Sequence, residues 1–483
     1  MSSVVPVTVA FGDGIGPFIT EATLDIIQAA GANIKIEEIV VGEKSYLAGY
    51  TSGIADQDWN TIFKNRVFLK APITTPQGSG YKSLNVTIRK ALNLYANVRP
   101  CRAYAPFVNT HFPKLDLTII RENEEDLYAG VEYQPTPTVV NSLKVITKAG
   151  CERIVRYAFD YAVKNGHTKV TCMTKDNIMK MADGMFHATF DAIAKEYPQI
   201  ETDHYIIDIG AARLAARPEI FDVIVTLNLY GDIISDIVAE VSGSVGLAGS
   251  GNIGLKYSMF EAIHGSAPAM QDKKAANPSG ILSGAIMMLA HIGQGSVATR
   301  VQNALLKTIE DGIATKDFYN VENSKKLVNT AQFAQAVIAN LGENPKTFAV
   351  QQYADFDFQN DISGDQISAI TSTSVKQDVV GVDFYMACTK ESMDFYKAIS
   401  KFSFGSLQFQ MMSFRGMMFD PETQFAKGTI ADYWRCRFIS KGTSQTEILS
   451  LASKLNDAGY AIASMYTLSN YNDVRGFTLA QGQ

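Results

Sequence analysis

The stretch that indicates the fold is Val4-Val-Pro-Val-Thr-Val-Ala-Phe11, followed by Gly12-Asp-Gly-Ile-Gly16-Pro17 and by apolar residues at roughly helical spacing up to Ile27. This is the order of a β-strand, a glycine loop and a helix. Similar units follow, with helices expected over 150–165 and 182–194. Further buried strands are expected over 66–70, 115–121, 169–174, 205–209 and 223–229. The alternation predicts an α/β fold with a largely parallel sheet.

The glycine loop has the spacing G-x-G-x-G, whereas a dinucleotide-binding turn requires G-x-G-x-x-G. In addition, no acidic residue closes a second strand where a ribose would be held. We therefore interpret Gly12, Gly14 and Gly16 as shaping a tight strand-to-helix turn, and we do not predict a classical Rossmann domain.

Three arginines lie close together in a span that is otherwise rich in apolar strand residues. The planar guanidinium group binds carboxylates through two parallel hydrogen bonds, so such a group predicts a small, multiply charged acid as ligand. A single arginine is more often a solvated surface residue, but these three stand beside polar residues in apolar surroundings. The set comprises Arg89, Arg99 and Arg121, with Ser83, Asn85 and Tyr128 beside them.

Two aspartates, Asp232 and Asp236, follow an apolar strand at a spacing of four residues. They share one face of the expected helix, at the carboxyl end of a strand, where open α/β sheets bind their ligands. Carboxylate oxygens at this place suit Mg²⁺ or Mn²⁺. The alternative is that Asp232 only caps the helix and Asp236 is solvated. Asp208, which follows another apolar run, is a weaker third carboxylate of the same kind.

Two further motifs are weaker when taken alone. Lys175 ends an apolar strand and is followed by Asp176 and Asn177, and a lysine in such a place can act as a base or simply be solvated. A polar loop before the apolar helix at 281 offers backbone N–H groups to a phosphate, although a generic loop would look similar. This loop holds His264, Gly265, Ser266, Ala267 and Asn277.

The composition of the 483 residues is that of an ordinary globular protein, with 46% hydrophobic and 19% charged residues. The formal net charge of −6 predicts no general attraction to nucleic acid, so an anionic ligand needs a local basic pocket. The five cysteines are widely spaced and favour a reducing, cytoplasmic location. No signal peptide is apparent, and no apolar run reaches the ~18 residues of a membrane helix.

The alternation of expected strands and helices ends before residue 346. Residues 346–378 are polar and rich in Gly, Asn, Asp and Ser, which predicts a linker. Residues 379–483 then show strand, helix, strand, strand, helix and strand, the ferredoxin-like order. No ligand-binding motif stands out in this module, so we expect it to serve oligomerisation rather than regulation by a small ligand.

Taken together, these motifs resemble the isocitrate and isopropylmalate dehydrogenase family over about residues 4–345. The trailing module resembles the extra C-terminal domain of the longer bacterial isocitrate dehydrogenases. Within the family, Ser83 and Asn85 look like the isocitrate enzymes, because isopropylmalate enzymes replace both to receive an apolar substituent. The resemblance implies metal-dependent oxidation and decarboxylation of isocitrate to 2-oxoglutarate, with hydride transfer to a nicotinamide coenzyme.

The resemblance also implies an architecture. A large α/β domain would comprise residues 1–97 and 245–345, and a small domain would comprise residues 98–244 with a dimer clasp near 130–147. The active sites of such a homodimer or higher homo-oligomer are shared, so that Lys175 and Asp208 would reach in from the partner subunit. Neither nucleic acid nor membrane is expected as a partner.

Site residues follow from the same resemblance. Lys175 would serve the base step and Tyr128 would protonate carbon after decarboxylation, while Asp208, Asp232 and Asp236 would hold Mg²⁺ or Mn²⁺. Substrate would be bound by Thr75, Ser83, Asn85, Arg89, Arg99, Arg121 and Asn177. The coenzyme would be bound by His264, Gly265, Ser266, Ala267, Asn277 and Lys316.

The choice of coenzyme departs from the family pattern. After the His-Gly-Ser-Ala-Pro motif, this chain has Ala269-Met270 instead of the acidic residue of NAD-preferring relatives or the Lys-Tyr of NADP-preferring relatives. Because no carboxylate would repel a 2′-phosphate and lysines 273, 274 and 316 lie nearby, we favour NADP, with NAD as the alternative. Asn320 stands where some NADP enzymes have arginine.

Two rival functions are also compatible with the resemblance. The first is oxidation of a different malate derivative, such as isopropylmalate or homoisocitrate. The second is a role as a non-catalytic regulatory subunit, which is disfavoured because every expected catalytic position is filled in this sequence.

Overall fold

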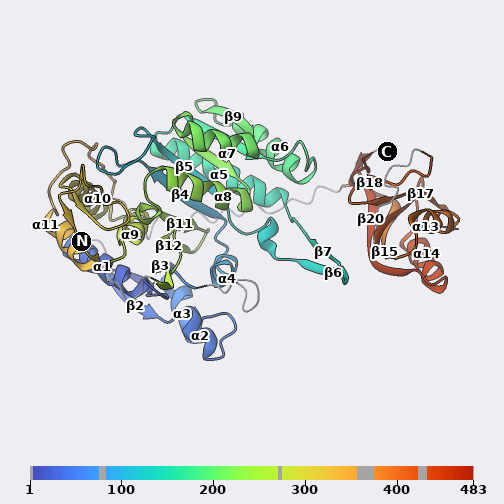
Figure 1. Cartoon of the computed structure of the whole chain (residues 1–483), viewed down its shortest axis with the longest axis horizontal. Helices are drawn as coiled ribbons and strands as arrows, with labels where there is room; N and C mark the ends of the chain where they lie inside the picture. Colours follow the sequence, from blue (N-terminus) through green and yellow to red (C-terminus); the bar gives the residue numbers. More distant parts are fainter. Residues whose placement is uncertain (1–3, 75–82, 270–274, 356–374, 423–431, 482–483) are drawn as a thin grey trace. The chain divides into compact units, whose positions relative to one another are not determined.

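The computed structural model describes residues 4–74, 83–269, 275–355, 375–422 and 432–481. They belong to two compact units (Figure 1). The first unit comprises residues 1–129 and 144–367, and the second comprises residues 130–143 and 368–483. The α/β fold and the separate C-terminal sheet domain predicted from the sequence are both confirmed.

A ten-stranded sheet forms the centre of the first unit, in the order β2-β1-β3-β12-β11-β4-β5-β10-β8-β9. It is mostly parallel, but β11 and β4 run antiparallel to their neighbours in its middle. Its strands are β1 (Val5–Ala10), β2 (Ile34–Ile39), β3 (Val67–Lys70), β4 (Ala96–Arg102), β5 (Asp116–Glu122), β8 (Lys169–Thr174), β9 (Glu201–Ile206), β10 (Val223–Thr226), β11 (Gly249–Ile253) and β12 (Ser258–Ala262). A two-stranded piece, β13 (Ile313–Ala314) with β14 (Lys326–Leu327), lies apart from it.

Helices cover both faces of this sheet (Figure 1), so central strands such as β3 and β10 are fully buried and mostly apolar. One hydrophobic cluster joins β1, β3 and β12 to α1, α9, α10 and α11, and another joins β4, β5, β8 and β10 to α5 and α6. The helices are α1 (Gly16–Ala29), α2 (Glu43–Leu47), α3 (Asp56–Asn65), α4 (Leu84–Ala91), α5 (Lys148–Asn165), α6 (Ala182–Ala194), α7 (Ile207–Ala216), α8 (Asn228–Val241), α9 (Ser279–His291), α10 (Gly295–Glu310) and α11 (Thr330–Ala339).

One uninterrupted sheet therefore runs through the predicted large and small domains. The first cluster draws mainly on residues before 72 and after 246, whereas the second draws on residues 96–227. The boundary between the two domains stays a prediction.

The glycine loop between β1 and α1 makes the tight turn that its spacing predicts. Gly12 and Gly14 have φ angles of +65° and +60°, in the left-handed region that favours glycine. A Cβ atom on Gly14 would lie 2.1 Å from the carbonyl oxygen of Ser266, and that oxygen accepts a hydrogen bond of 3.0 Å from the Ile15 N–H. The turn thus packs directly against the loop that the sequence assigns to the coenzyme.

Two expected strands end earlier than predicted. The expectation for 205–209 is wrong, because β9 ends at Ile206 and α7 begins at Ile207. The expected strand 223–229 likewise ends at Thr226, and α8 begins at Asn228. In both places the apolar run continues from the strand into the first turn of a helix, so the pattern of hydrophobicity does not mark the junction.

In the second unit, four long strands lie in the order β17-β19-β15-β20 and all pair antiparallel, which is the ferredoxin-like arrangement. Helices α13 and α14 cover the buried face through Phe395, Leu451 and other residues of one cluster. The elements are β15 (Gln377–Ala387), α13 (Ser392–Ile399), β16 (Ser403–Phe404), β17 (Leu407–Phe414), β18 (Met417–Met418), β19 (Tyr433–Ile439), α14 (Gln445–Asp457), β20 (Ala461–Tyr471) and β21 (Val474–Arg475).

The predicted clasp segment contains a hairpin, β6 (Glu132–Thr136) with β7 (Val139–Ser142), that belongs to the second unit. The hydroxyl of Thr138 donates a hydrogen bond of 2.6 Å to Asp432, and the amide of Asn141 donates one of 2.9 Å to the Tyr433 hydroxyl. The sequence did not indicate that this hairpin and the C-terminal module share one unit.

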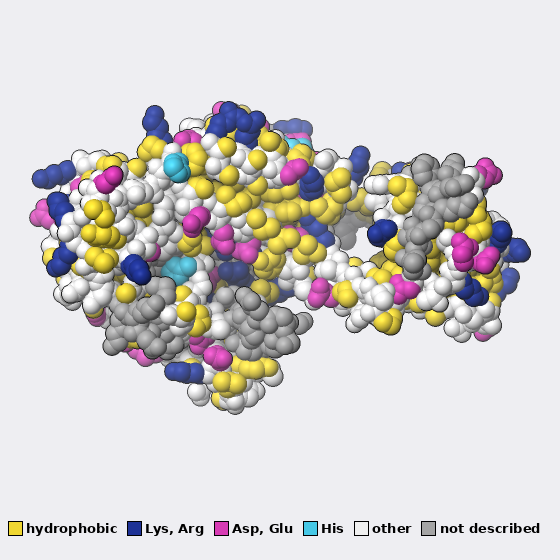
Figure 2. Space-filling model, viewed as in Figure 1, with side chains coloured by type: hydrophobic (Ala, Val, Ile, Leu, Met, Phe, Trp, Pro, Cys, Tyr) yellow, Lys and Arg dark blue, Asp and Glu magenta, His cyan; other side chains and the backbone are white. Residues whose placement is uncertain are grey.

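Most of the predicted linker, residues 356–374, lies outside the described residues. The part before it packs on α10, where Asn303 exchanges two hydrogen bonds of 2.9 Å with the backbone of Gln351. On the face shown in Figure 2, basic and acidic side chains are interspersed. None of the helices that the structure describes combines the length and the apolarity needed to cross a bilayer.

The second unit offers a test of its buried ion pair. Arg437 donates two hydrogen bonds of 2.7 Å to the carboxylate of Asp383, and both residues are buried. D383N would leave a buried cation without its counter-charge, which lowers the free energy of unfolding of this unit by about 3 kcal/mol. Denaturant unfolding followed by the fluorescence of Trp434, in a W59F background, reports on this unit.

The matched control is D378N, because the ion pair between Asp378 and Lys376 is exposed. We expect that variant to unfold at the denaturant concentration of its parent. Equal effects of D383N and D378N would contradict the role of the buried pair.

Candidate active site

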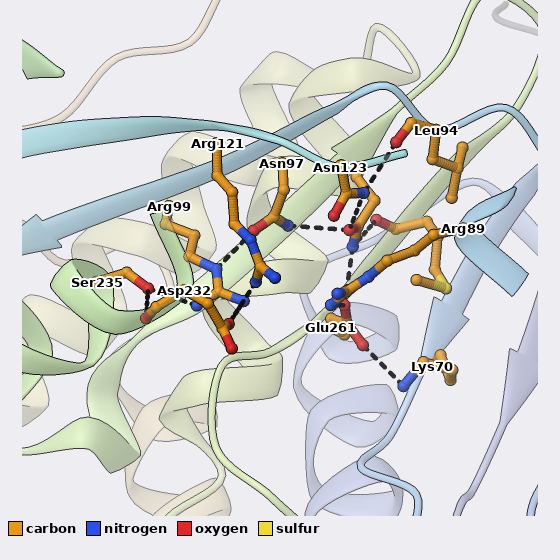
Figure 3. A network of polar contacts seen from close by, with 12 residues as sticks. Lys70, Arg89, Leu94, Asn97, Arg99, Arg121, Asn123, Asp232, Ser235 and Glu261 are labelled. Carbon is orange, nitrogen blue, oxygen red and sulfur yellow. Dashed lines mark hydrogen bonds and ion pairs between the residues drawn. The ribbon is translucent and has the colours of Figure 1, made fainter. Parts of the chain in front are cut away.

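Three buried guanidinium groups converge at the middle of the ten-stranded sheet (Figure 3). Arg99 lies on β4, Arg121 on the neighbouring β5, and Arg89 near the end of α4. Arg121 donates hydrogen bonds of 2.9 Å to the Asn228 carbonyl and 2.7 Å to its side-chain oxygen. The structure therefore brings together the three arginines that the sequence singles out.

Burial and mutual repulsion act on this cluster. Burial lowers the pKa of Arg121 to about 9, and the positive charges of Arg99 and Arg89 add to the effect. Burial also lowers the pKa of Arg99, against the attraction of Asp232. Like charges held together in a buried site favour the binding of an anion, because an anion relieves their repulsion.

The first turns of α8 bring a carboxylate to the arginines. Asp232 forms ion pairs with Arg121 and, at 3.3 Å, with Arg99, and it accepts a hydrogen bond of 2.5 Å from the Tyr128 hydroxyl. Burial opposes ionisation of Asp232, but the attraction of Arg121 and Arg99 prevails and lowers its pKa. Tyr128 lies in a 3₁₀ turn, η1 (Leu127–Ala129), so this turn and α8 together place a hydroxyl beside the cluster.

Asp236, one helical turn further on, lies 3.8 Å from Arg99, and 70% of its side chain is exposed. Burial of part of its carboxyl group raises its pKa, with Arg99 opposing the shift. The two aspartates thus share the helix face that their spacing predicts, one bound to the arginines and the other open to solvent. Two carboxylates in this arrangement suit a divalent cation with oxygen ligands.

A second buried carboxylate, Glu261 of β12, holds the other end of the cluster. It lies 2.7 Å from Lys70 of β3 and 2.9 Å from Arg89, and all three side chains are buried. Although burial opposes ionisation, Lys70 and Arg89 hold the pKa of Glu261 well below its usual range. Sequence analysis missed Lys70 and Glu261 as site residues. A charged residue within an otherwise apolar strand could have indicated both, because a charged side chain that is buried there needs a partner of opposite charge.

The coenzyme loop adjoins the arginines, because Arg89 and Arg99 line one cavity together with His264 and Gly265. The Nδ1 atom of His264 lies 3.0 Å from the Gly265 carbonyl oxygen, while its buried Nε2 atom has no hydrogen-bond partner among the described residues. If Nδ1 carries the proton, Nε2 is an acceptor that a ligand N–H or O–H can satisfy. The residues present therefore fit a nucleotide at this place.

The other predicted coenzyme residues are arranged around this loop. The Ser266 hydroxyl lies 2.9 Å from that of Thr74, and Ala267 has a φ angle of +40°. Asn277 donates a hydrogen bond of 2.9 Å to Asp317 from the end of the loop, and Lys316 is exposed next to that aspartate. Lysines 273 and 274 lie outside the described residues.

Predicted substrate residues on α4 are partly described. Thr75 lies outside the described residues, whereas Ser83 precedes α4 with its side chain half-buried. Asn85 lines the same cavity as Arg89, and its Oδ1 atom is buried with no hydrogen-bond partner in the described part of the chain. A buried polar atom of this kind favours a polar ligand over an apolar one.

Lys175 and Asp208 form a separate pair. Their charged atoms lie 3.1 Å apart, at the end of β8 and the start of α7, and the pairing lowers the pKa of Asp208. Among the described contacts, none joins this pair to the arginines, and β8 stands two strands, or about 10 Å, from β5. Asn177 is exposed nearby. Within one chain, these predicted residues thus come together with each other and not with the arginines.

A cluster of possible metal ligands elsewhere contains Asp176, His187 and His204. The two imidazole rings stack at 3.7 Å with an angle of 16° between their planes. Nitrogen atoms of parallel stacked rings point along separate planes and do not converge on one ion, so we assign no metal to this cluster.

Comparison with known proteins agrees with this geometry. A family model described as isocitrate/isopropylmalate dehydrogenase matches residues 6–337. The chain belongs to this family. A second model, described as bacterial isocitrate dehydrogenase, C-terminal domain, matches residues 377–483.

Individual relatives of this family member match it over its whole length. The isocitrate dehydrogenase [NADP] of Rickettsia bellii is 51% identical over 488 residues and covers 100% of both chains. That of Thermus thermophilus is 40% identical and covers 99% of this chain and 96% of its own. The crystal structure of the TT0538 protein from Thermus thermophilus has a TM-score of 0.92 at 38% identity, covering 100% of this chain and 98% of its own.

The buried Glu261 generates a prediction about stability and pH. E261Q leaves Lys70 and Arg89 buried without their carboxylate, so the free energy of unfolding at pH 7 should fall by about 3 kcal/mol. The pKa of Glu261 is depressed in the folded state, so its contribution is fully present above the unfolded pKa of about 4.3 and is lost as the pH falls below it. The difference between wild type and E261Q should therefore shrink in acid.

Denaturant unfolding at pH 7 and at pH 3.5 measures this difference. E196Q is the control, since the ion pair of Glu196 with Arg156 is exposed and its removal should change little. A difference between wild type and E261Q that does not depend on pH would contradict the predicted ionisation of Glu261.

Proposed function

We propose that this protein catalyses the oxidative decarboxylation of isocitrate to 2-oxoglutarate, with hydride transfer to NADP and with Mg²⁺ or Mn²⁺ bound. The observation that carries the proposal is the buried cluster of Arg89, Arg99 and Arg121 beside Asp232 and Tyr128 (Figure 3). This cluster combines a binding site for several carboxylates with a metal ligand and a proton donor. The full-length relatives named isocitrate dehydrogenase [NADP] support the same activity and coenzyme.

The charges of the site favour a tricarboxylate with a divalent cation. Four cationic side chains face three carboxylates in it, which leaves one net positive charge. A tricarboxylate bound with a divalent cation carries one net negative charge, so the complete site is neutral. The four cations are Lys70, Arg89, Arg99 and Arg121, and the three carboxylates are Asp232, Asp236 and Glu261. Burying an unbalanced charge is costly, so this balance favours isocitrate over a smaller anion.

The residues around the arginines favour isocitrate over isopropylmalate. Ser83 and Asn85 offer two donors on the side of α4, the hydroxyl and the amide N–H₂ group. An apolar substituent placed against them would leave those donors without a hydrogen bond. A third carboxylate of the substrate, in contrast, can be held there by the Asn85 amide, the Ser83 hydroxyl and Arg89.

Asp232 and Asp236 would hold the metal ion, with Asp208 of a partner subunit as a third ligand. When bound, such an ion lowers the pKa of the substrate hydroxyl and stabilises negative charge at that oxygen. The exposed carboxylate of Asp236 leaves room for this ligand set. Asp232 now forms ion pairs with Arg121 and Arg99, and if it held a metal ion instead, both guanidinium groups would be free to bind the substrate.

Lys175 of the partner subunit, with Asp208 beside it, would serve as the base that takes the proton of the substrate hydroxyl. A bound nicotinamide would supply the hydride acceptor for the carbon that bears this hydroxyl. The β-carboxylate then departs as carbon dioxide. Tyr128 donates its proton to the carbon left behind. Its pKa is raised by burial, so the hydroxyl keeps its proton at neutral pH until that step. A homodimer is needed for this scheme, because within one chain Lys175 pairs with Asp208 away from the arginines.

The coenzyme is bound by the loop around His264, Gly265, Ser266, Ala267 and Asn277, whose place beside the arginines suits transfer of hydride from the bound substrate. Lys316 offers a positive charge near the end of this loop, which favours the 2′-phosphate of NADP over NAD. We further propose that the enzyme works in the cytoplasm.

Initial rates of the purified protein test this function. With Mn²⁺ present we expect isocitrate to be oxidised with a kcat/KM for NADP at least about tenfold above that for NAD. Removal of the metal with a chelator should abolish the reaction. Faster turnover of isopropylmalate or homoisocitrate would overturn the choice of substrate, and a larger kcat/KM with NAD would overturn the choice of coenzyme. No activity under any of these conditions would instead favour a regulatory subunit.

The role of Tyr128 gives a further prediction. Y128F removes a proton donor but leaves the arginines in place, so kcat for the overall reaction should fall by about 100-fold or more while the KM for isocitrate stays within a few-fold. Y257F, on the partly buried Tyr257 of the same unit, is the control and should keep wild-type rates. An unchanged kcat in Y128F would exclude Tyr128 as the acid.

A further inference from the structure

A buried asparagine, Asn252 of β11, connects two of the arginines through hydrogen bonds. Its amide nitrogen donates a hydrogen bond of 2.9 Å to Glu261 Oε1, the same oxygen that accepts 2.9 Å from Arg89. Its amide oxygen accepts 2.9 Å from Asn97 Nδ2, and Asn97 Oδ1 accepts 2.5 Å from Arg99 Nε. An unbroken chain of hydrogen bonds thus runs from Arg99 to Arg89.

The groups at the two ends of this chain of hydrogen bonds, Arg99 and Glu261, fix the direction of donation. A guanidinium group only donates hydrogen bonds, and an ionised carboxylate only accepts them. Starting from Arg99, the Asn97 oxygen must therefore accept, so that its nitrogen donates to Asn252. The Asn252 nitrogen in turn points to Glu261. Each amide has one orientation that satisfies both neighbours, which makes the chain directional.

Asn252 uses its full hydrogen-bonding capacity. Besides Asn97, its oxygen accepts 3.1 Å from Asn123, and besides Glu261, its nitrogen donates 3.3 Å to the Met259 carbonyl. Asn123 also donates 2.8 Å to the Leu94 carbonyl. The Asn252 side chain has little freedom to turn, because all four of its hydrogen-bonding positions are satisfied. Any other orientation of the buried amide would leave some of them unsatisfied, which is costly.

We propose that Asn252 is a positioning residue that sets the distance and orientation between Arg89 and Arg99, and thereby between the substrate carboxylates that they bind. This inference rests on the proposed function, because it assigns a consequence to the arginines as substrate ligands. Left alone, the two buried cations repel each other. The chain through Asn97 and Asn252 ties both to the single carboxylate of Glu261 without bringing a further negative charge into the pocket.

Substitution of Asn252 tests this role. N252L keeps the approximate size of the side chain and removes all four of its hydrogen bonds. N252D keeps the acceptor for Asn97 but replaces the donor that faces Glu261 by an oxygen atom. We expect each variant to raise the KM for isocitrate by at least about tenfold, with kcat and the KM for NADP within about threefold of wild type.

N303L is the matched control, because Asn303 of α10 is equally buried and bonds to the backbone of Gln351, away from the pocket. It should lower the melting temperature as N252L does and leave the KM for isocitrate unchanged. If N252L and N252D change only the stability, as N303L does, the positioning role is wrong. It is also wrong if they raise the KM for isocitrate and the KM for NADP together.

R99M separates this inference from the function on which it rests. A raised KM for isocitrate in R99M with normal constants in both Asn252 variants would overturn only the role of Asn252. A wild-type KM in R99M would overturn the assignment of the arginines as substrate ligands, and the positioning role with it.

Discussion

The repulsion among three buried guanidinium groups is the constraint on which the rest of this structure depends. Arg89, Arg99 and Arg121 come from one helix and two strands, and burial together with the positive charge of the first two lowers the pKa of the third. Such a cluster persists only where counter-charges and hydrogen bonds oppose the repulsion. Glu261 and Asp232 provide the charges, one at each end of the cluster, and further hydrogen bonds go to Asn97, Asn228 and Ser235.

The sheet supplies the geometry that this constraint requires. Because successive side chains of a strand alternate between faces, Asn97 and Arg99 of β4 point to the same side, and Asn97 pairs with Arg121 of β5 in the antiparallel register. Polar side chains are therefore concentrated in the antiparallel middle of the sheet, whereas helices cover its parallel parts. The tight β1–α1 turn packs against Ser266 and holds the neighbouring coenzyme loop close to this point.

Sequence reasoning identified the α/β fold, the ferredoxin-like module, the arginines and the helix face of Asp232 and Asp236, because each rests on local spacing. It misplaced the end of β9, since Ile206 and Ile207 are both apolar and the junction between strand and helix falls between them. It also missed the roles of Lys70, Asn97, Asn252 and Glu261. Asn252 and Glu261 lie on the neighbouring strands β11 and β12, but Asn97 and Lys70 join them only through pairing with β4 and β3, which are distant in sequence. Spacing along the chain carries no information on such distant contacts. The grouping of the hairpin at 130–143 with the C-terminal module is non-local for the same reason.

The arginines and the aspartates of α8 are proposed to bind a tricarboxylate and a divalent cation as a unit, and this coupling is the central claim. Calorimetric titration of isocitrate in the absence of coenzyme, with and without Mn²⁺, measures it directly. Because a bound ion would compete with Arg99 and Arg121 for Asp232, the two ligands would strengthen each other reciprocally, and we predict that Mn²⁺ lowers the Kd of isocitrate by at least about tenfold. The same Kd with and without Mn²⁺ would contradict this coupling.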